Sequence, residues 1–178
     1  KRLRPETLGP FDYDKENYTS LLWVMEGITS YYDNLLLRRA GFYKEEDVIA
    51  NLLGTMNYVE NQEGFNVQSL AQASFDAWIK AYRPNENSSN TTISYYSKGA
   101  IAGALLDAII IGSSNSTKSL DDFLRLLYKK YYLEENRGFS ELEFRNDLES
   151  FIGSELPEFF DEYVNGVTHI NYSNYFSN

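Results

Sequence analysis

The sequence contains no cysteine and only one histidine, His169. No disulfide can therefore form, and no thiolate is available to hold a metal ion. This composition fits a reducing compartment but also allows a bacterial periplasm, and we favour the cytoplasm of the two. His169 lies in a polar stretch near the end of the chain, where we expect an exposed side chain rather than a metal ligand.

Positive charge is also scarce, because 16 Lys and Arg residues stand against 26 Asp and Glu residues and give a net charge of −10. Nucleic acids and anionic membrane surfaces attract basic proteins, so this balance argues against both as partners. No apolar run approaches the roughly 20 residues that a membrane-spanning helix needs. We therefore expect neither a nucleic-acid partner nor a membrane partner.

The composition does provide for a hydrophobic core. The 178 residues are 43% hydrophobic and 16% aromatic, with 15 Tyr and 11 Phe. A chain of this length can bury the core of one domain, and we interpret the surplus of aromatic residues as core packing. The chain opens on Lys1-Arg2-Leu3-Arg4-Pro5 without a Met, so we expect it to be cut from a longer protein.

Helical periodicity and capping residues predict about six or seven helices, and no segment has a clear strand pattern. Short loops join these helices, so we expect an all-α, bundle-like fold. We expect one domain over residues 1–178, with an irregular lead-in at 1–17 and a polar, aromatic tail at 167–178. The expected helices cover residues 17 or 19 to 39, 44–61, 70–82, 93–111, 119–132, 140–152 and 157–164.

A single carboxylate, Glu26, lies within a run of large apolar residues. Leu21–Met25 is apolar throughout and Ile28 continues the run, which is the pattern of a buried helix. Glutamate is rarely buried unless it is paired or binds a ligand. Glu26 therefore either pairs with an arginine or caps a neighbouring element, or it is a metal ligand or a catalytic acid/base. Gly27 has no side chain and would let another backbone approach beside the carboxylate.

The stretch Leu-Trp-Val-Met-Glu-Gly-Ile-Thr-Ser-Tyr-Tyr at 22–32 resembles the motif that supplies the glutamate ligand in gluzincin zinc peptidases. In that group a His-Glu-x-x-His helix supplies two histidine ligands and a following helix supplies the glutamate. Several separated motifs resemble the glycyl aminopeptidase family in particular, whose members often carry a PDZ domain, and the resemblance covers nearly the whole chain. These further motifs lie at 17–19, 73–78, 82–84 and 95–100.

The resemblance implies a fold and roles for individual residues. The fold would be the helical half of a gluzincin (thermolysin-like) catalytic domain. Glu26 would be the third zinc ligand. Tyr96 matches the tyrosine of a Tyr-x-Lys-Gly-Ala pattern whose phenol stabilises the oxyanion of the tetrahedral intermediate, with Tyr95 as the neighbouring alternative. We expect Lys98 at the surface or behind the metal ligands. Asp33 would orient a histidine ligand, or be solvated or paired with an arginine.

The chain departs from the family pattern because the His-Glu-x-x-His helix would lie before Lys1. The resemblance therefore implies a longer zinc aminopeptidase that cleaves peptides after an N-terminal Gly or Ala. We expect this chain alone to be inactive, to hold no zinc tightly and to self-associate through exposed apolar surface. The alternative is a non-catalytic all-α scaffold or interaction module derived from a degenerate peptidase, in which Glu26 is purely structural. The sequence upstream of Lys1 would distinguish the two.

Overall fold

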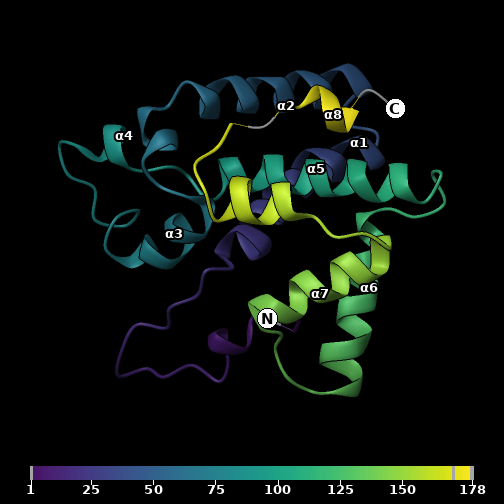
Figure 1. Cartoon of the computed structure of the whole chain (residues 1–178), viewed down its shortest axis with the longest axis horizontal. Helices are drawn as coiled ribbons and strands as arrows, with labels where there is room; N and C mark the ends of the chain where they lie inside the picture. The colour runs from purple at the N-terminus through teal and green to yellow at the C-terminus, as the bar shows by residue number, and fades with distance from the viewer. Residues whose placement is uncertain (1, 170, 177–178) are drawn as a thin grey trace.

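The computed structural model describes residues 2–169 and 171–176, and within these ranges the chain is helical with no strand (Figure 1). An isolated bridge between Pro5 and Phe139 is the one β-type pairing in this part of the chain. The expected all-α fold is therefore confirmed. The α-helices are α1 (Ile28–Arg39), α2 (Glu45–Glu60), α3 (Leu70–Phe75), α4 (Ser88–Thr91), α5 (Ser97–Ser113), α6 (Leu120–Leu127), α7 (Glu141–Ile152) and α8 (Ser173–Phe176). The 3-10 helices are η1 (Glu6–Leu8), η3 (Glu63–Asn66) and η4 (Asp76–Trp78), and the π-helices are η2 (Trp23–Gly27), η5 (Tyr128–Glu134) and η6 (Glu158–Val164).

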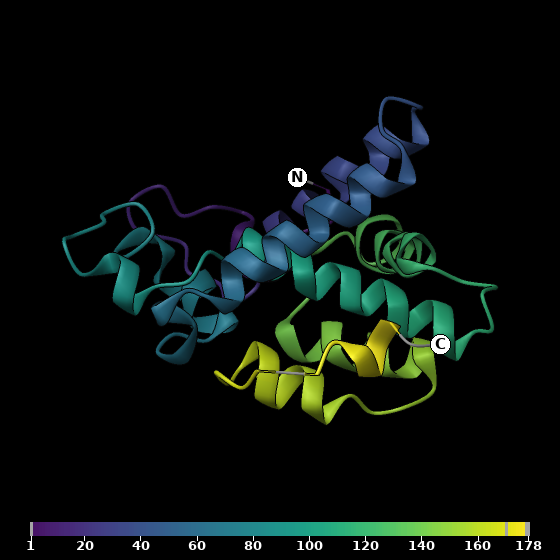
Figure 2. The same ribbon diagram turned by 90° about the horizontal axis from the view of Figure 1, so that it is seen from above.

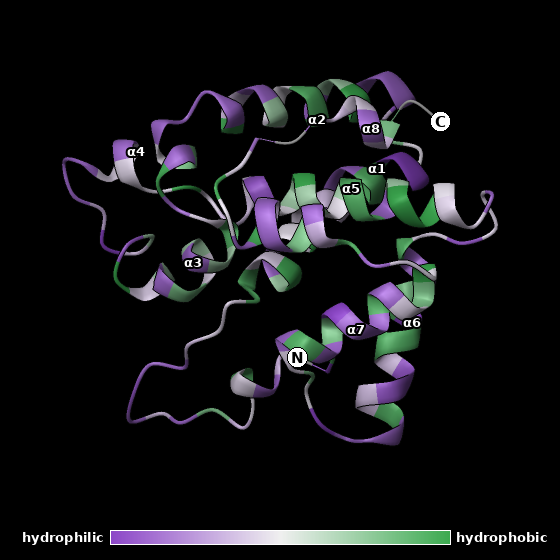
Figure 3. Cartoon of the chain, viewed as in Figure 1, coloured by the Kyte–Doolittle hydropathy of each residue, from purple (hydrophilic) through white to green (hydrophobic). Residues whose placement is uncertain are grey.

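Helix α5 forms the centre of the molecule. Figure 2 shows α2 crossing it on one side and the segment from α7 to α8 on the other. Figure 3 shows that α5 is predominantly hydrophobic. Its first half is rich in glycine and alanine, and such small residues let α1 and η2 pack closely against it, as the sequence indicates. None of the helices in the described ranges is long and apolar enough to cross a membrane.

The helix around Glu26 forms as expected, although it starts later and has a different first turn. It begins at Trp23 as the π-helix η2 and continues into α1, because the Ile28 N–H donates to the Trp23 carbonyl five residues earlier. The Trp23 N–H donates to Ser74 Oγ at 3.1 Å, which satisfies a free amide at the helix start. Trp23 itself is 1% exposed. After α1, Gly41 has the left-handed conformation that commonly ends a helix, with φ of +81°.

Local capping signals also predict other helix ends correctly. Ser140 Oγ accepts from the Glu143 N–H at 3.2 Å, while Glu143 Oε2 accepts from the Ser140 N–H at 2.8 Å. This reciprocal pair starts α7, and Gly153 ends it with φ of +84°. Pro157 precedes η6, where the sequence indicates a short helix.

Several expected boundaries are wrong. The helix expected over 70–82 ends at Trp78, and the one expected from Ile93 starts at Ser97. Ile93 is held outside α5 because its N–H donates to Gln68 Oε1 at 3.0 Å. The helix expected to end at 132 continues to 134 in η5, and the polar loop after Pro84 contains the short α4.

The tail is packed against the rest of the chain rather than free of it. His169 Nδ1 and the Tyr172 hydroxyl both contact the Glu60 carboxylate, and the His169 ring stacks on Phe65 with 4.1 Å between centroids. The His169 side chain is 44% exposed, as expected, although its pairing with Glu60 was not predicted. Helix α8 then lies against α5. Lys1 of the lead-in and Ile170, Ser177 and Asn178 of the tail lie outside the described residues.

Candidate functional site

The turn that carries Glu26 lies directly against the turn that carries Tyr96, through a glycine-to-glycine contact. A Cβ atom added to Gly27 would lie 2.5 Å from Gly99 Cα, and one added to Gly99 would lie 2.8 Å from Gly27 Cα. Contacts this short exclude any side chain at either position. The expectation that Gly27 admits a second backbone is thus confirmed, and that backbone is the Lys98-Gly99-Ala100 segment.

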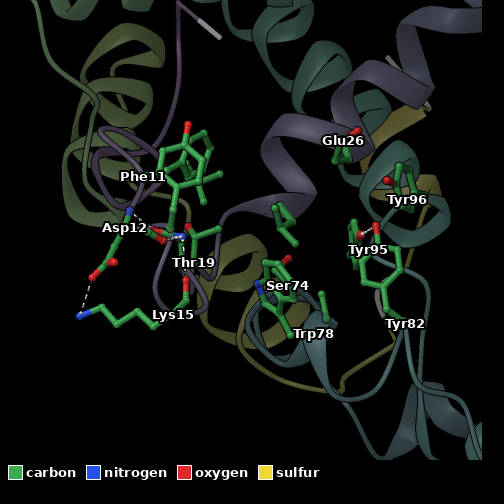
Figure 4. A pocket seen from close by; sticks show the side chains of 15 residues that line it. Phe11, Asp12, Lys15, Thr19, Glu26, Ser74, Trp78, Tyr82, Tyr95 and Tyr96 are labelled. Atoms are coloured by element: carbon green, nitrogen blue, oxygen red, sulfur yellow. Dashed lines mark hydrogen bonds and ion pairs between the residues drawn. The ribbon is translucent and has the colours of Figure 1, made fainter.

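Glu26 and Tyr96 line one cavity of about 640 Å³, which we call the Glu26 cavity (Figure 4). Its walls come from the loop 8–19, from Leu22 and η2, from the end of α3 with η4, and from Tyr82, Tyr95 and Tyr96. Figure 4 draws Glu26 and Tyr96 next to each other, with Tyr95 and Tyr82 beyond Tyr96. The fold therefore gathers both residues singled out from the sequence at one concave surface.

The Glu26 carboxylate has no partner among residues 2–169 and 171–176. No side chain or backbone amide in these ranges donates a hydrogen bond to it, and no arginine pairs with it. The arginine-pairing and capping interpretation therefore finds no support in the described part of the chain. The residue is partly rather than fully buried, and its backbone carbonyl accepts from Ser30 Oγ at 2.9 Å. Its carboxylate oxygens are free to bind a ligand.

Tyr95 and Tyr96 differ sharply in exposure. Tyr95 is 3% exposed and its hydroxyl lies 3.0 Å from that of Tyr82, whereas Tyr96 is 40% exposed. A hydrogen bond with Tyr82 raises the pKa of the Tyr96 hydroxyl, and burial and the negative charge of Glu26 raise it further. A phenol with a raised pKa stays protonated at neutral pH and can donate a hydrogen bond into the cavity.

Lys98 lies in the core, so of the two places expected for it, the surface is wrong. The residue is 0% exposed, and Nζ lies 4.0 Å from the centroid of the Phe65 ring and 4.7 Å from that of Tyr163. Nζ has no hydrogen-bond acceptor in the described residues, and burial lowers its pKa to about 8. Helical spacing could have indicated this burial, because it places Lys98 on the same helix face as Ile101, Ala102 and Leu105. All three of these residues are 0% exposed.

The sequence predicts no role at a site for the other aromatic residues of the cavity. Phe11, Trp78 and Tyr82 are 50%, 50% and 65% exposed, so the aromatic surplus is only partly core packing. They come from three separate segments, and although Trp78 and Tyr82 lie in the motifs at 73–78 and 82–84, no local pattern indicates that they meet Phe11 at one cavity. Asp33, by contrast, is exposed and does not line the Glu26 cavity.

The residues that the structure describes contain no group of three or more His, Asp or Glu side chains that could hold a metal ion. The other carboxylate of the cavity, Asp12, forms an ion pair with Lys15 at 3.3 Å. Glu26 is therefore able to contribute one ligand oxygen, and further ligands would have to come from elsewhere.

Comparison with known proteins identifies the family. No curated protein matches the chain. The crystal structure of an aminopeptidase N family protein from Idiomarina loihiensis matches with a TM-score of 0.92 at 30% identity. The match covers 99% of this chain and 30% of that one, so the chain spans less than a third of that protein. The sequence model of the M61 glycyl aminopeptidase family matches residues 1–102, more than half of the chain and a range that includes both Glu26 and Tyr96. The chain therefore belongs to the M61 glycyl aminopeptidase family.

Proposed function

We propose that this chain is part of the catalytic domain of a zinc-dependent aminopeptidase that removes N-terminal Gly or Ala from peptides. The observation that carries the proposal is the shared cavity, where an unpartnered carboxylate at Glu26 lies beside the phenol of Tyr96. Membership of the glycyl aminopeptidase family supports the reaction class. We further propose that residues 1–178 act as one unit of a longer protein with a PDZ domain, as the resemblance implies.

Glu26 is the proposed third ligand of the zinc ion. Zinc accepts carboxylate oxygens at about 2.0–2.2 Å, and a catalytic site uses three protein ligands with one open position. A ligand must also be held rigidly. The buried Trp23 and the Gly27–Gly99 contact fix the turn of Glu26 on both sides. The two histidine ligands would come from a His-Glu-x-x-His helix outside this chain. When bound, zinc supplies an acidified water and polarises the scissile carbonyl.

Tyr96 is the proposed donor to the oxyanion that develops on the substrate carbonyl. A donor aimed at charge that develops only in the transition state lowers the barrier without tightening substrate binding. The Tyr96 phenol keeps its proton at neutral pH, as this role requires, because tyrosine has a pKa of about 10 and its surroundings raise that pKa further. Tyr95 is less suited, because it is 3% exposed whereas Tyr96 is 40% exposed.

We also propose that the chain by itself is inactive, because one carboxylate cannot hold zinc against water. Apolar side chains of α2 such as Ile49 and Leu53 are 50% and 59% exposed. This exposed surface supports self-association of the isolated chain. Light scattering that gave a clean monomer would contradict that part of the proposal.

The test uses the full-length protein, with zinc content and hydrolysis of Gly- and Ala-anilides as readouts. Wild type is compared with Glu26→Gln and with Glu86→Gln, a matched change in the exposed polar loop. We expect about one zinc per molecule and activity in wild type and Glu86→Gln, and loss of both in Glu26→Gln. A wild-type protein without zinc would instead favour the non-catalytic scaffold.

A further inference from the structure

The Glu26 cavity extends beyond Glu26 and Tyr96 into a part with aromatic walls. Phe11 reaches it from the lead-in, Trp78 from η4, and Leu22 from the position just before η2. Phe11 and Trp78 are each 50% exposed, although both could bury more area in a core. Large apolar side chains gathered around one hollow are typical of a binding site.

The polar groups of this part of the cavity are already satisfied within the chain. The Asn17 side-chain amide donates to the Asp12 carbonyl at 2.8 Å, and its oxygen accepts from the Asp12 N–H at 2.9 Å. Ser74 Oγ accepts from the Trp23 N–H and donates to the Leu70 carbonyl at 3.0 Å. The Asp12 carboxylate is neutralised by Lys15. A charged ligand would find no free counter-charge here, whereas an apolar one would lose nothing by displacing water.

We propose that this apolar part of the cavity binds the side chain of the residue that follows the scissile bond, and that it favours a large apolar side chain there. The proposal rests on the proposed function. A glycine at the N-terminus has no side chain and nothing precedes it, so it cannot fill a cavity of about 640 Å³. The first side chain that a Gly-peptide offers belongs to its second residue. With the scissile carbonyl between Glu26 and Tyr96, that side chain lies within reach of the same cavity.

The test compares Gly-Phe-amide with Gly-Gly-amide as substrates of the full-length protein. Wild type should have the higher kcat/KM for Gly-Phe-amide. Trp78→Ala and, separately, Phe11→Ala should each lower the ratio of the two kcat/KM values about tenfold, the usual effect of a few lost apolar contacts. Phe42→Ala is the control, since Phe42 is 79% exposed and does not line the cavity. A wild type without preference, or equal ratios in all variants, would overturn the proposal.

A binding measurement separates failure of this proposal from failure of the proposed function. A 5-fluorotryptophan at position 78 of the full-length protein reports occupancy by its fluorine NMR shift. We expect N-acetyl-phenylalanine amide to shift this signal saturably and N-acetyl-alanine amide to leave it in place. If neither Gly-Phe-amide nor Gly-Gly-amide is hydrolysed but the phenylalanine compound shifts the fluorine signal, the peptidase function is wrong and the apolar site stands. No shift with the phenylalanine compound refutes the site, whatever the activity.

Discussion

Replacing Gly27 by alanine tests the contact on which the site depends. A Cβ at Gly27 would lie 2.5 Å from Gly99 Cα, 2.6 Å from its carbonyl carbon and 2.9 Å from the Tyr95 carbonyl oxygen. All three atoms belong to backbone, so no side-chain rotation can relieve the clash. The two helices must separate at this point, which moves Glu26 relative to Tyr96.

The expected effect on stability is a balance of two terms. Overpacking in a core costs about 1–3 kcal/mol, and a backbone-to-backbone clash belongs at the upper end of that range. Alanine stabilises a helix by about 1 kcal/mol relative to glycine, which offsets part of this cost. We therefore expect Gly27→Ala to lower the free energy of unfolding by about 2 kcal/mol.

Gly54 provides the matched control, because it lies within α2 and a Cβ there would meet nothing within 4 Å. Gly54→Ala carries the helix-propensity gain without a clash and should raise the free energy of unfolding by about 0.5–1 kcal/mol. Urea unfolding with a common m-value measures both variants. If Gly27→Ala were as stable as Gly54→Ala, the proposed close approach of the two turns would be refuted.

Three further predictions follow from the contacts of single side chains. The pKa of Lys98 is about 8 in the folded protein and 10.5 in the unfolded chain. Between pH 8 and 9.5 the unfolded state therefore binds more protons than the folded state, and the free energy of unfolding should rise by about 1.5 kcal/mol as the pH increases over this range. Lys98→Met should abolish this rise in urea titrations, and an unchanged slope would contradict the buried, unpaired amine. A hydrogen bond from Arg137 lowers the pKa of Glu143 to about 2, so stability from this group is lost as pH falls from 4.5 towards 2, and Glu143→Gln should flatten the acid limb of the stability curve. Tyr96→Phe in the full-length protein should lower kcat about 10²–10³-fold with zinc content and KM little changed, and a variant with near wild-type kcat would exclude the oxyanion role.

The sequence predicted those parts of the fold that depend on neighbours along the chain. The Ser140 and Glu143 capping pair predicts the start of α7, and Gly153 predicts its end. The start of α5 was misplaced because a side chain from a distant segment, Gln68, holds Ile93 outside the helix. Such a contact leaves no trace in local periodicity.

The same distinction applies to the candidate site. Glu26 and Gly27 stood out because a carboxylate and a glycine in an apolar run are locally inconsistent with a plain core helix, and such inconsistencies often mark functional positions. The π-helical turn at Trp23–Gly27 is a second departure at the same place, and π-turns recur at functional sites. The aromatic walls of the Glu26 cavity could not be found in this way, because Phe11, Trp78 and Tyr82 meet only after the chain has folded.

The first turn of α5 is fixed from two sides by consecutive residues, and this has a consequence for Tyr96. The backbone of Gly99 packs against Gly27, and the side chain of Lys98 lies against the rings of Phe65 and Tyr163. Sliding or rotating the turn would break one contact or the other, so the backbone at Tyr96, directly before the turn, is held in place. A donor for a transient oxyanion gains its effect from being placed in advance, since no reorganisation is then needed as charge develops. A buried lysine without a hydrogen bond is costly to folding, and in this position the cost is offset by an anchor for the residue proposed to act on the substrate.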